Sequence, residues 1–492
     1  MSSLGNIQVK LSDGRDLTEL FQFLIEENAR MEEEYGEPVD ILDDDLERNL
    51  DYLPEHFREL CRDIFTVKSK DSVYKFDEPD SPFNVEFSPD QELVGATFLK
   101  LIEKITDEGT TELSNIVFYT FPIYSSPKEL LEALIQRHRV PIPPLMSASE
   151  FKTFQMKKVR SIQSKVASLL KKWIKLWPMH FKEQKGIKAM LQRFLEDLRD
   201  STSDTFTKNN CKPILQSLAS LDEEEKEYKV TFGDLREPPP PQLPKEIDFK
   251  MEPLLLWSPT EIARQLSLIE SDMLKAVGIG ELLSRNWEKN DKETLAPNVL
   301  AISKRFASCR GLILNAIVSQ SDFNNRVKIV KKLLEVATEC LTVINNFESP
   351  FIINSALKSD TIRALDATCK EVKKSATHRG MWQKLEEIYD SNFVAVRQEM
   401  VTNNCKVPCF LALRQELNQN DIRRKDKLES GLINVSKHKA TADVLERITN
   451  YQQQILVFHP IKMLYQYLKA QDFQCDEDAL FRQAKNLEPV TN

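Results

Sequence analysis

The stretch VRSIQSKVASLLKKWIKLW, residues 159–177, decides how this part of the chain folds. Its apolar residues recur at steps of three and four, which places them along one side of an α-helix. That stripe consists of Val159, Ile162, Val166, Leu169, Leu170, Trp173, Ile174 and Trp177. The other side carries Lys157, Lys158, Arg160, Lys165, Lys171, Lys172 and Lys175. The pattern predicts a long amphipathic helix, whose basic side is either a solvated face or a surface for anionic lipid or nucleic acid.

The same spacing returns further along the chain, so we expect an all-α fold. A second stripe consists of Val327, Val330, Leu334, Ala337, Leu341 and Ile344. Ser258, Pro259 and Glu261 form a helix start, with Ser258 as the N-cap and Pro259 in the first turn. The 492 residues include only 12 glycines. Helical proteins need few glycines, whereas tightly turned β folds and phosphate-cradling loops need more.

Composition divides the chain into four segments, which fits roughly 100–200 residues per domain. Residues 1–84 are acidic and are predicted to form a small helical or partly ordered region; the acidic runs are either a solvated face or an autoinhibitory or partner-binding element. Residues 85–230 are predicted to be helical throughout. Residues 231–252 form a linker rich in proline, either a stiff spacer or a proline-recognition site. Residues 253–480 are predicted to form a second helical domain.

Several classes of function are disfavoured by what the sequence lacks. The net charge of −9 argues against nucleic acid as the main partner, and no apolar run is long enough to span a membrane. The eight cysteines are scattered, and Cys405 and Cys409, the only close pair, have no further ligands nearby, so no metal site is expected. Phosphate-loop, nucleophile-elbow, metalloprotease and kinase motifs are all missing. We therefore expect a cytoplasmic protein without a cofactor, which acts by binding rather than by covalent chemistry.

Short motifs within residues 255–470 occur in a characteristic order. They are EIARQLSLIESDMLKAV at 261–277, Glu281-Leu282-Leu283 with Trp287, Asn298, Arg326 within NNRVKIVKKLLEVA, Asn345-Asn346-Phe347, Val407-Pro408, and Leu432 to Lys437. This order resembles the catalytic domain of Ras guanine nucleotide exchange factors, the family that includes Son of Sevenless. The last two motifs are similar to the segments that bracket the family's protruding helical hairpin.

The upstream segment resembles the Ras exchanger motif domain that precedes the catalytic domain in this family. The similar stretches are Gly95-Ala96-Thr97 with Leu101-Ile102-Glu103, Tyr124 to Leu131, and LLKKWIKLWPMHF at residues 169–181. The two modules stand in the family's order, and the resemblance covers roughly residues 85–470. It therefore implies an exchange factor whose helical catalytic domain is accompanied by a helical stabilising module.

The resemblance implies that a hairpin between Pro408 and Leu432 pries switch I of a small GTPase away from its nucleotide. An ungapped match places Asn418 and Ile422 at the family's apolar and carboxylate positions, whereas a one-residue shift places Leu417 and Asp421 there. We expect Leu417 and Asp421 to be the catalytic pair, because their spacing of four puts both on one helix face. The alternative is that Leu417 packs under the hairpin and Asp421 is solvated. The residues expected to bind the GTPase are Arg326, Phe351, Lys358 and Asn418.

Departures from the family pattern leave two functions open. Lys358 stands where the family has an asparagine that contacts the GTPase, Leu411 where it has a glycine, and Ala364 where it has an arginine. One function is active exchange on a Ras-superfamily GTPase, of Ras or Rap type, by a monomer that reaches the membrane through its GTPase. The other is a degenerate domain that binds a GTPase or adaptor as a scaffold. A third possibility is a lipid-binding protein that uses the basic face near Lys171.

Overall fold

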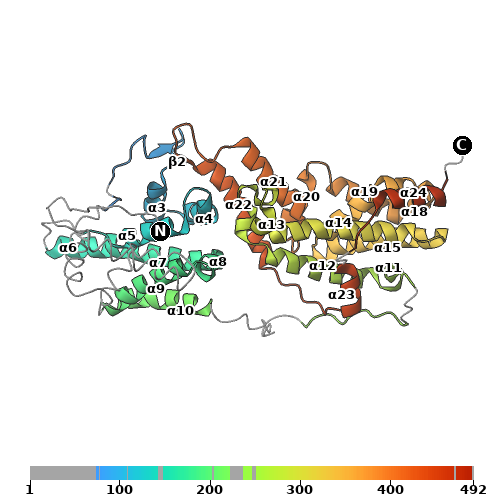
Figure 1. Ribbon diagram of the computed structural model, residues 1–492, viewed down its shortest axis with the longest axis horizontal. Coiled ribbons are helices and arrows are strands. Elements are labelled where there is room, and N and C mark those ends of the chain that lie inside the picture. The colour runs from blue at the N-terminus through green and yellow to red at the C-terminus, as the bar shows by residue number, and fades with distance from the viewer. Residues whose placement is uncertain are drawn as a thin grey trace, which may run out of the picture. The chain divides into compact units, whose positions relative to one another are not determined.

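The computed structural model describes residues 74–76, 78–107, 109–141, 148–201, 204–221, 237–246, 251–469 and 473–489 (Figure 1). The chain divides into two compact units, Met1–Lys75 and Phe76–Asn492, and the described residues belong almost entirely to the second. The acidic runs of the predicted N-terminal region lie outside the described residues.

The first part of this unit is a small helical module. Its elements are strands β1 (Val85–Phe87) and β2 (Leu93–Ala96), helices α3 (Phe98–Thr106), α4 (Thr111–Thr120), 3₁₀-helix η3 (Phe121–Ile123), α5 (Pro127–His138), α6 (Ala148–Phe154), π-helix η4 (Gln155–Val159), α7 (Arg160–Leu176), α8 (Pro178–Lys182), α9 (Lys185–Asp200) and α10 (Thr205–Ser220). The predicted amphipathic helix is confirmed as η4 followed by α7, and its apolar stripe is buried. Around it, Phe121 packs edge-on against Trp173 and Trp177.

The prediction that residues 85–230 are helical throughout is wrong at their start. Strands β1 and β2 pair antiparallel there, and β2 also pairs with β3 (Ile433–Asn434), with Gly95 opposite Asn434. A Cβ atom on Gly95 would stand 2.5 Å from the Leu428 side chain, so glycine permits this close approach. The partner strand comes from the other end of the chain, and local periodicity cannot show such a pairing.

The second part is a larger helical domain. Its elements are α11 (Pro253–Leu256), α12 (Pro259–Ala276), 3₁₀-helix η5 (Ile279–Glu288), α13 (Lys292–Leu295), α14 (Pro297–Val318), α15 (Phe323–Glu339), π-helix η6 (Cys340–Ile344), α16 (Glu348–Leu357), α17 (Asp360–Arg363), α18 (Asp366–Lys374), α19 (Ala376–Ile388), α20 (Val394–Thr402), α21 (Phe410–Arg423), strand β3, α22 (Val435–Gln452), α23 (Lys462–Lys469) and α24 (Glu477–Leu487). Together with the first module, these helices confirm the all-α class.

Local signals explain why the core helices form where they do. The Ser258 hydroxyl accepts a hydrogen bond from the backbone N–H of Glu261 at 3.2 Å, which confirms the predicted N-cap of α12. Helix α15 packs against α12, α16 and α19. The predicted second stripe, from Val327 to Ile344, is buried in that core, as an amphipathic helix requires.

The proline-rich segment lies against the start of α12. The backbone N–H of Gln242 donates to the Glu261 carboxylate at 3.0 Å, and Arg264 donates to the carbonyl of Pro240 at 3.2 Å. Pro238–Pro241 form neither helix nor strand. In the described ranges, no helix is both long and apolar enough to cross a bilayer.

Candidate functional site

The candidate site is the hairpin formed by α21 and α22, which pack side by side in Figure 1. Residues 424–434 join the two helices and contain strand β3. Helix α21 buries Phe410, Ala412, Leu413 and Leu417. Its N-cap residue, Cys409, provides no side-chain cap for the first turn of the helix.

Glu348 provides that cap from another helix. Its Oε2 atom accepts a hydrogen bond from the backbone N–H of Phe410, the first residue of α21, at 2.8 Å. The Glu348 side chain is only 6% exposed, and burial, together with nearby Glu270, raises its pKa to about 8. The start of α21 is thereby fixed to the start of α16.

A buried polar network holds Glu348 in turn. The Asn346 amide donates to Ser267 and Glu270 at 2.8 Å, and its oxygen accepts from the backbone N–H of Glu348 at 2.8 Å. Asn345 ends π-helix η6 in the left-handed conformation, with φ 61°, which asparagine tolerates. Asn345 therefore ends one helix, and the Asn346 side chain caps the first residue of the next. Burial raises the pKa of Glu270, against the opposing charge of nearby Arg305.

The hairpin residues chosen from the sequence have different environments. Leu417 lies on α21 and is buried, at 2% exposure. The Asp421 carboxylate pairs with Lys437, near the start of α22, at 3.0 Å. Asn418 is half-buried, and its side-chain oxygen has no hydrogen-bond partner among the described residues. Ile422 is 66% exposed and lies in the last turn of α21.

The other predicted GTPase-binding residues fall into two places. Phe351 and Lys358, both on or beside α16, meet at Tyr389: the two rings lie 5.6 Å apart, and the lysine donates to the Tyr389 carbonyl at 3.4 Å. Arg326 is 3% exposed and pairs with Glu488 at 3.1 Å. The structure thus brings Phe351 and Lys358 together, and it places Arg326 in an internal ion pair. The GTPase contacts of all three stay predictions.

The first module braces the hairpin along α22. Helix α4 packs on α22, and the Asn115 amide donates to Glu446 at 2.7 Å. Lys172 of α7 donates to the Asn115 oxygen, and desolvation lowers the pKa of this lysine to about 8. Lys172 was predicted to lie on the basic outer side of its helix; it is instead half-buried at this contact.

Three further contacts join the hairpin to the first module. The Tyr124 and His438 rings stack edge to face, 5.0 Å apart, and burial lowers the pKa of His438 to about 4. Lys439 pairs with Glu112 at 2.5 Å on the surface. Strands β2 and β3 tie the connecting loop to the same module. The hairpin is therefore held at its start by α16 and along its second helix by the first module.

Sequence reasoning missed the residues that hold the hairpin. Glu348 follows the Asn345-Asn346-Phe347 motif directly, but a glutamate in a first helical turn is usually explained by the helix dipole alone. Asn115 and Glu446 lie 331 positions apart in the chain. The only signal available was the match of both modules to one family, which implied that they act together.

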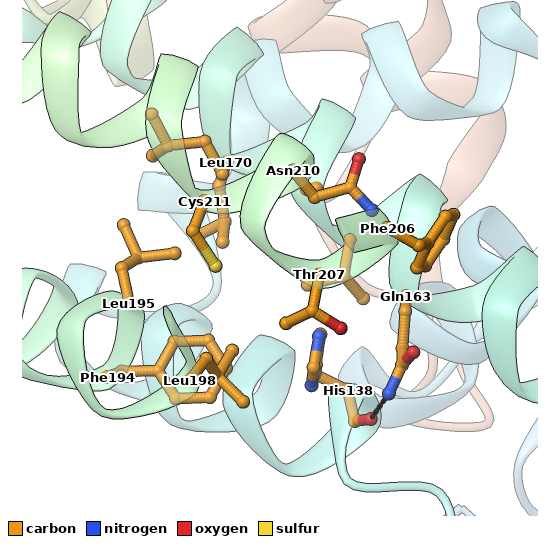
Figure 2. A pocket seen from close by; sticks show the side chains of 13 residues that line it. His138, Gln163, Leu170, Phe194, Leu195, Leu198, Phe206, Thr207, Asn210 and Cys211 are labelled. Carbon is orange, nitrogen blue, oxygen red and sulfur yellow. Dashed lines mark hydrogen bonds between the residues drawn. The ribbon is translucent and has the colours of Figure 1, made fainter. Parts of the chain in front are cut away.

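A cavity in the first module belongs to the core. It has a volume of about 10 Å³ and lies between α5, α7, α9 and α10, as Figure 2 shows. Gln163 donates to the His138 carbonyl at 3.4 Å there, and most other lining side chains are apolar. A space of this size holds at most one water molecule. Among the described residues, no group of three potential metal ligands is found either.

Comparisons with known proteins find a match for each of the two modules. Residues 92–197 match the RasGEF N-terminal motif, and residues 261–439 match the RasGEF domain. The Protein son of sevenless of Drosophila melanogaster is 24% identical over 81% of this chain and 27% of its own length. Ras guanine nucleotide exchange factor J of Dictyostelium discoideum is 23% identical over 80% of this chain and 48% of its own. The human Ras-specific guanine nucleotide-releasing factor 1 is 25% identical over 67% and 25%.

These matches define a helical protein in which a RasGEF N-terminal motif precedes a RasGEF domain. The chain belongs to the Ras guanine nucleotide exchange factor family, which confirms the resemblance found in the sequence. It spans about a quarter to a half of the length of these three relatives.

Proposed function

We propose that this protein accelerates GDP release from a small GTPase of the Ras superfamily, of Ras or Rap type. The two matched modules support this activity, and so do the relatives, which include a Ras-specific guanine nucleotide-releasing factor. The observation that carries the proposal is the support of the hairpin from two sides, by Glu348 at Phe410 and by α4 along α22.

A firmly held hairpin fits the physics of exchange. Exchange factor and nucleotide each weaken the binding of the other to the GTPase, which is a negative coupling between two ligands. A ten-thousandfold faster release needs about 5.5 kcal/mol of differential stabilisation, at about 1.4 kcal/mol per decade. A hairpin that is already ordered loses little conformational entropy when it wedges into the GTPase, so more of the contact energy is available for this coupling. No covalent chemistry is required.

We distinguish two arrangements of the hairpin surface that contacts the GTPase. In the first, the hairpin rearranges on binding, and Leu417 and Asp421 reach the GTPase as the catalytic pair. In the second, Leu417 and Asp421 hold the hairpin in shape, and the outer face with Asn418 and Ile422 makes the contact. The burial of Leu417 and the Asp421–Lys437 ion pair support the second arrangement.

The rest of the contact surface is proposed at Phe351 and Lys358. Both pack around Tyr389, whose hydroxyl donates to the Phe347 carbonyl at 2.8 Å, one residue before Glu348. A GTPase that contacts this cluster therefore binds next to a segment that is adjacent in sequence to Glu348, the residue that caps α21. Arg326 contributes a contact only if its ion pair with Glu488 opens.

Release of a fluorescent nucleotide from Ras, Rap, Ral and Rho GTPases tests the proposal. We expect acceleration with at least one Ras-type or Rap-type GTPase at catalytic amounts of the protein. Binding to a nucleotide-free GTPase without any acceleration across the panel would reject the activity. It would favour the scaffold function, for which the departure at Lys358 is the sequence argument.

A further inference from the structure

The segment formed by α6 and η4 presents apolar and basic side chains together to solvent. Phe151 is 40% exposed and Met156 is 54% exposed. Lys152, Lys157 and Lys158 are exposed between and beside them. Large exposed apolar side chains are ordinary when single, but two that are interleaved with three lysines make a distinct surface. We call this set of five residues the α6–η4 surface.

The backbone of this surface departs from ordinary helix. Residues Gln155–Val159 form a π-helix, in which the backbone N–H of Arg160 donates to the carbonyl of Gln155. Single π-turns within α-helices are rare and occur frequently at functional sites. Here the turn contains Met156, Lys157 and Lys158, while Val159 stays buried in the module.

A wide groove runs along the same turn. Its volume is about 940 Å³, and its lining includes Lys157 and Lys158 of η4, Lys104 of α3, and Thr110 at the start of α4. Among the lining residues that the structure describes, the acidic one is Asp107, which pairs with Arg137 at 2.7 Å, and Lys104 pairs with Asp80 at 2.6 Å. Neither Lys157 nor Lys158 has a carboxylate partner in the part of the chain that the structure describes. The positive charge of the groove is therefore available to an anion.

We propose that the α6–η4 surface binds an anionic phospholipid bilayer directly. Lys157 and Lys158 pair with lipid phosphates at the mouth of the groove, while Phe151 and Met156 enter the boundary between headgroups and acyl chains. A bilayer satisfies both kinds of side chain at once, because its negative headgroups lie directly above an apolar layer. Nucleic acid offers charge without an apolar layer. This surface lies on the first module, and the proposal does not rest on exchange activity.

Co-sedimentation of the full chain with vesicles tests the proposal. The vesicles contain phosphatidylcholine alone or with phosphatidylserine. We expect binding only when phosphatidylserine is present, and weaker binding at higher salt. The double variant K157A/K158A should bind about thirtyfold more weakly, since each lysine near an anionic surface contributes about 1 kcal/mol. At high salt the parent should keep part of its binding, and the double variant F151S/M156S should lose that part.

A matched control comes from α7 of the same helical stretch. Lys171 and Lys175 are exposed, so K171A/K175A removes the same charge from a different place and should change binding less than about threefold. Circular dichroism checks that all variants are folded. Equal losses in K157A/K158A and K171A/K175A would overturn the proposal, since binding would then follow charge alone. So would the absence of any binding to phosphatidylserine vesicles, or lysine-dependent binding to an RNA oligonucleotide in its place.

Discussion

At the scale of single residues, Glu348 is the buried acid on which the start of the hairpin depends. Its pKa is raised from the ordinary value near 4.5 to about 8, mainly because burial disfavours its charged form. A raised pKa in the folded state means that its contribution to stability is fully present below about pH 4.5. That contribution is lost as the pH rises through about 8. Both forms of the carboxyl group have an oxygen that accepts from Phe410.

The variant Glu348→Gln should therefore change the pH dependence of stability. Between about pH 5 and pH 8, the unfolding free energy of the parent should fall relative to the variant by at most about 1.4 kcal/mol per pH unit. Urea denaturation at several pH values measures this difference. The exposed Glu429→Gln variant is the control and should follow the parent. Parallel curves for the parent and Glu348→Gln would show that Glu348 is already ionised at low pH in the folded protein.

Substitutions of Leu417 and Ile422, both on α21, distinguish between the two arrangements of the hairpin surface that contacts the GTPase. Leu417→Ala removes a buried side chain and should lower the unfolding free energy by about 2–5 kcal/mol. Ile422→Ala removes an exposed one and should change stability by less than about 0.5 kcal/mol. In nucleotide release, Ile422→Ala should nevertheless slow exchange about tenfold, which corresponds to about 1.4 kcal/mol of lost contact. Parent-like exchange by Ile422→Ala, with folded but inactive Leu417→Ala, would favour direct contact by Leu417.

At the scale of elements, the interface between α4 and α22 determines how firmly the hairpin is held. Its polar centre is the Asn115 amide, which joins Glu446 to the half-buried Lys172. Removing one partner from such a network leaves the others desolvated and unpaired, and this costs more than an exposed ion pair contributes. The interface therefore allows a matched comparison between a half-buried contact and an exposed one.

Asn115→Ala should lower the unfolding free energy by about 1–3 kcal/mol, because Lys172 loses its partner. Lys439→Ala breaks the exposed pair with Glu112 and should cost less than about 1 kcal/mol. Chemical denaturation gives both values, and nucleotide release shows whether the weakened interface between α4 and α22 slows exchange. We expect slower exchange only for Asn115→Ala. Equal effects of the two substitutions on stability would mean that the Asn115 network is as solvated as the surface pair.

At the scale of the whole molecule, charge is distributed very unevenly along the chain. Residues 1–73 contain 19 acidic and 8 basic side chains, a formal charge of −11, whereas the whole chain carries −9. The remaining residues therefore carry a formal charge of +2. Such an uneven distribution matters for encounters with charged surfaces, since the acidic part repels what the lysines of the α6–η4 surface attract.

A chain that lacks residues 1–73 should associate with phosphatidylserine vesicles about tenfold faster at low ionic strength. The difference should shrink as salt is added, because exposed charges are screened over about 10 Å at 0.1 M salt. Stopped-flow mixing with vesicles of the same composition measures both rates. A difference that persists at high salt would point to a specific contact of the acidic residues rather than to their charge.

The sequence by itself determined the all-α class, the buried stripes of α7 and α15, the N-cap at Ser258 and the family. Those features depend on neighbours within a few positions, or on patterns that the chain displays in order. The tertiary structure alone decided that Glu348 caps α21, that β2 pairs with β3, and that Leu417 is buried while Ile422 is exposed. Each of these depends on which distant segments pack together, and a helical period does not specify the partner of a helix face. The first helix of the hairpin could thus be located from the sequence, whereas its second helix, α22, begins beyond the predicted end at Leu432. The supports of the hairpin and its outward face required the fold.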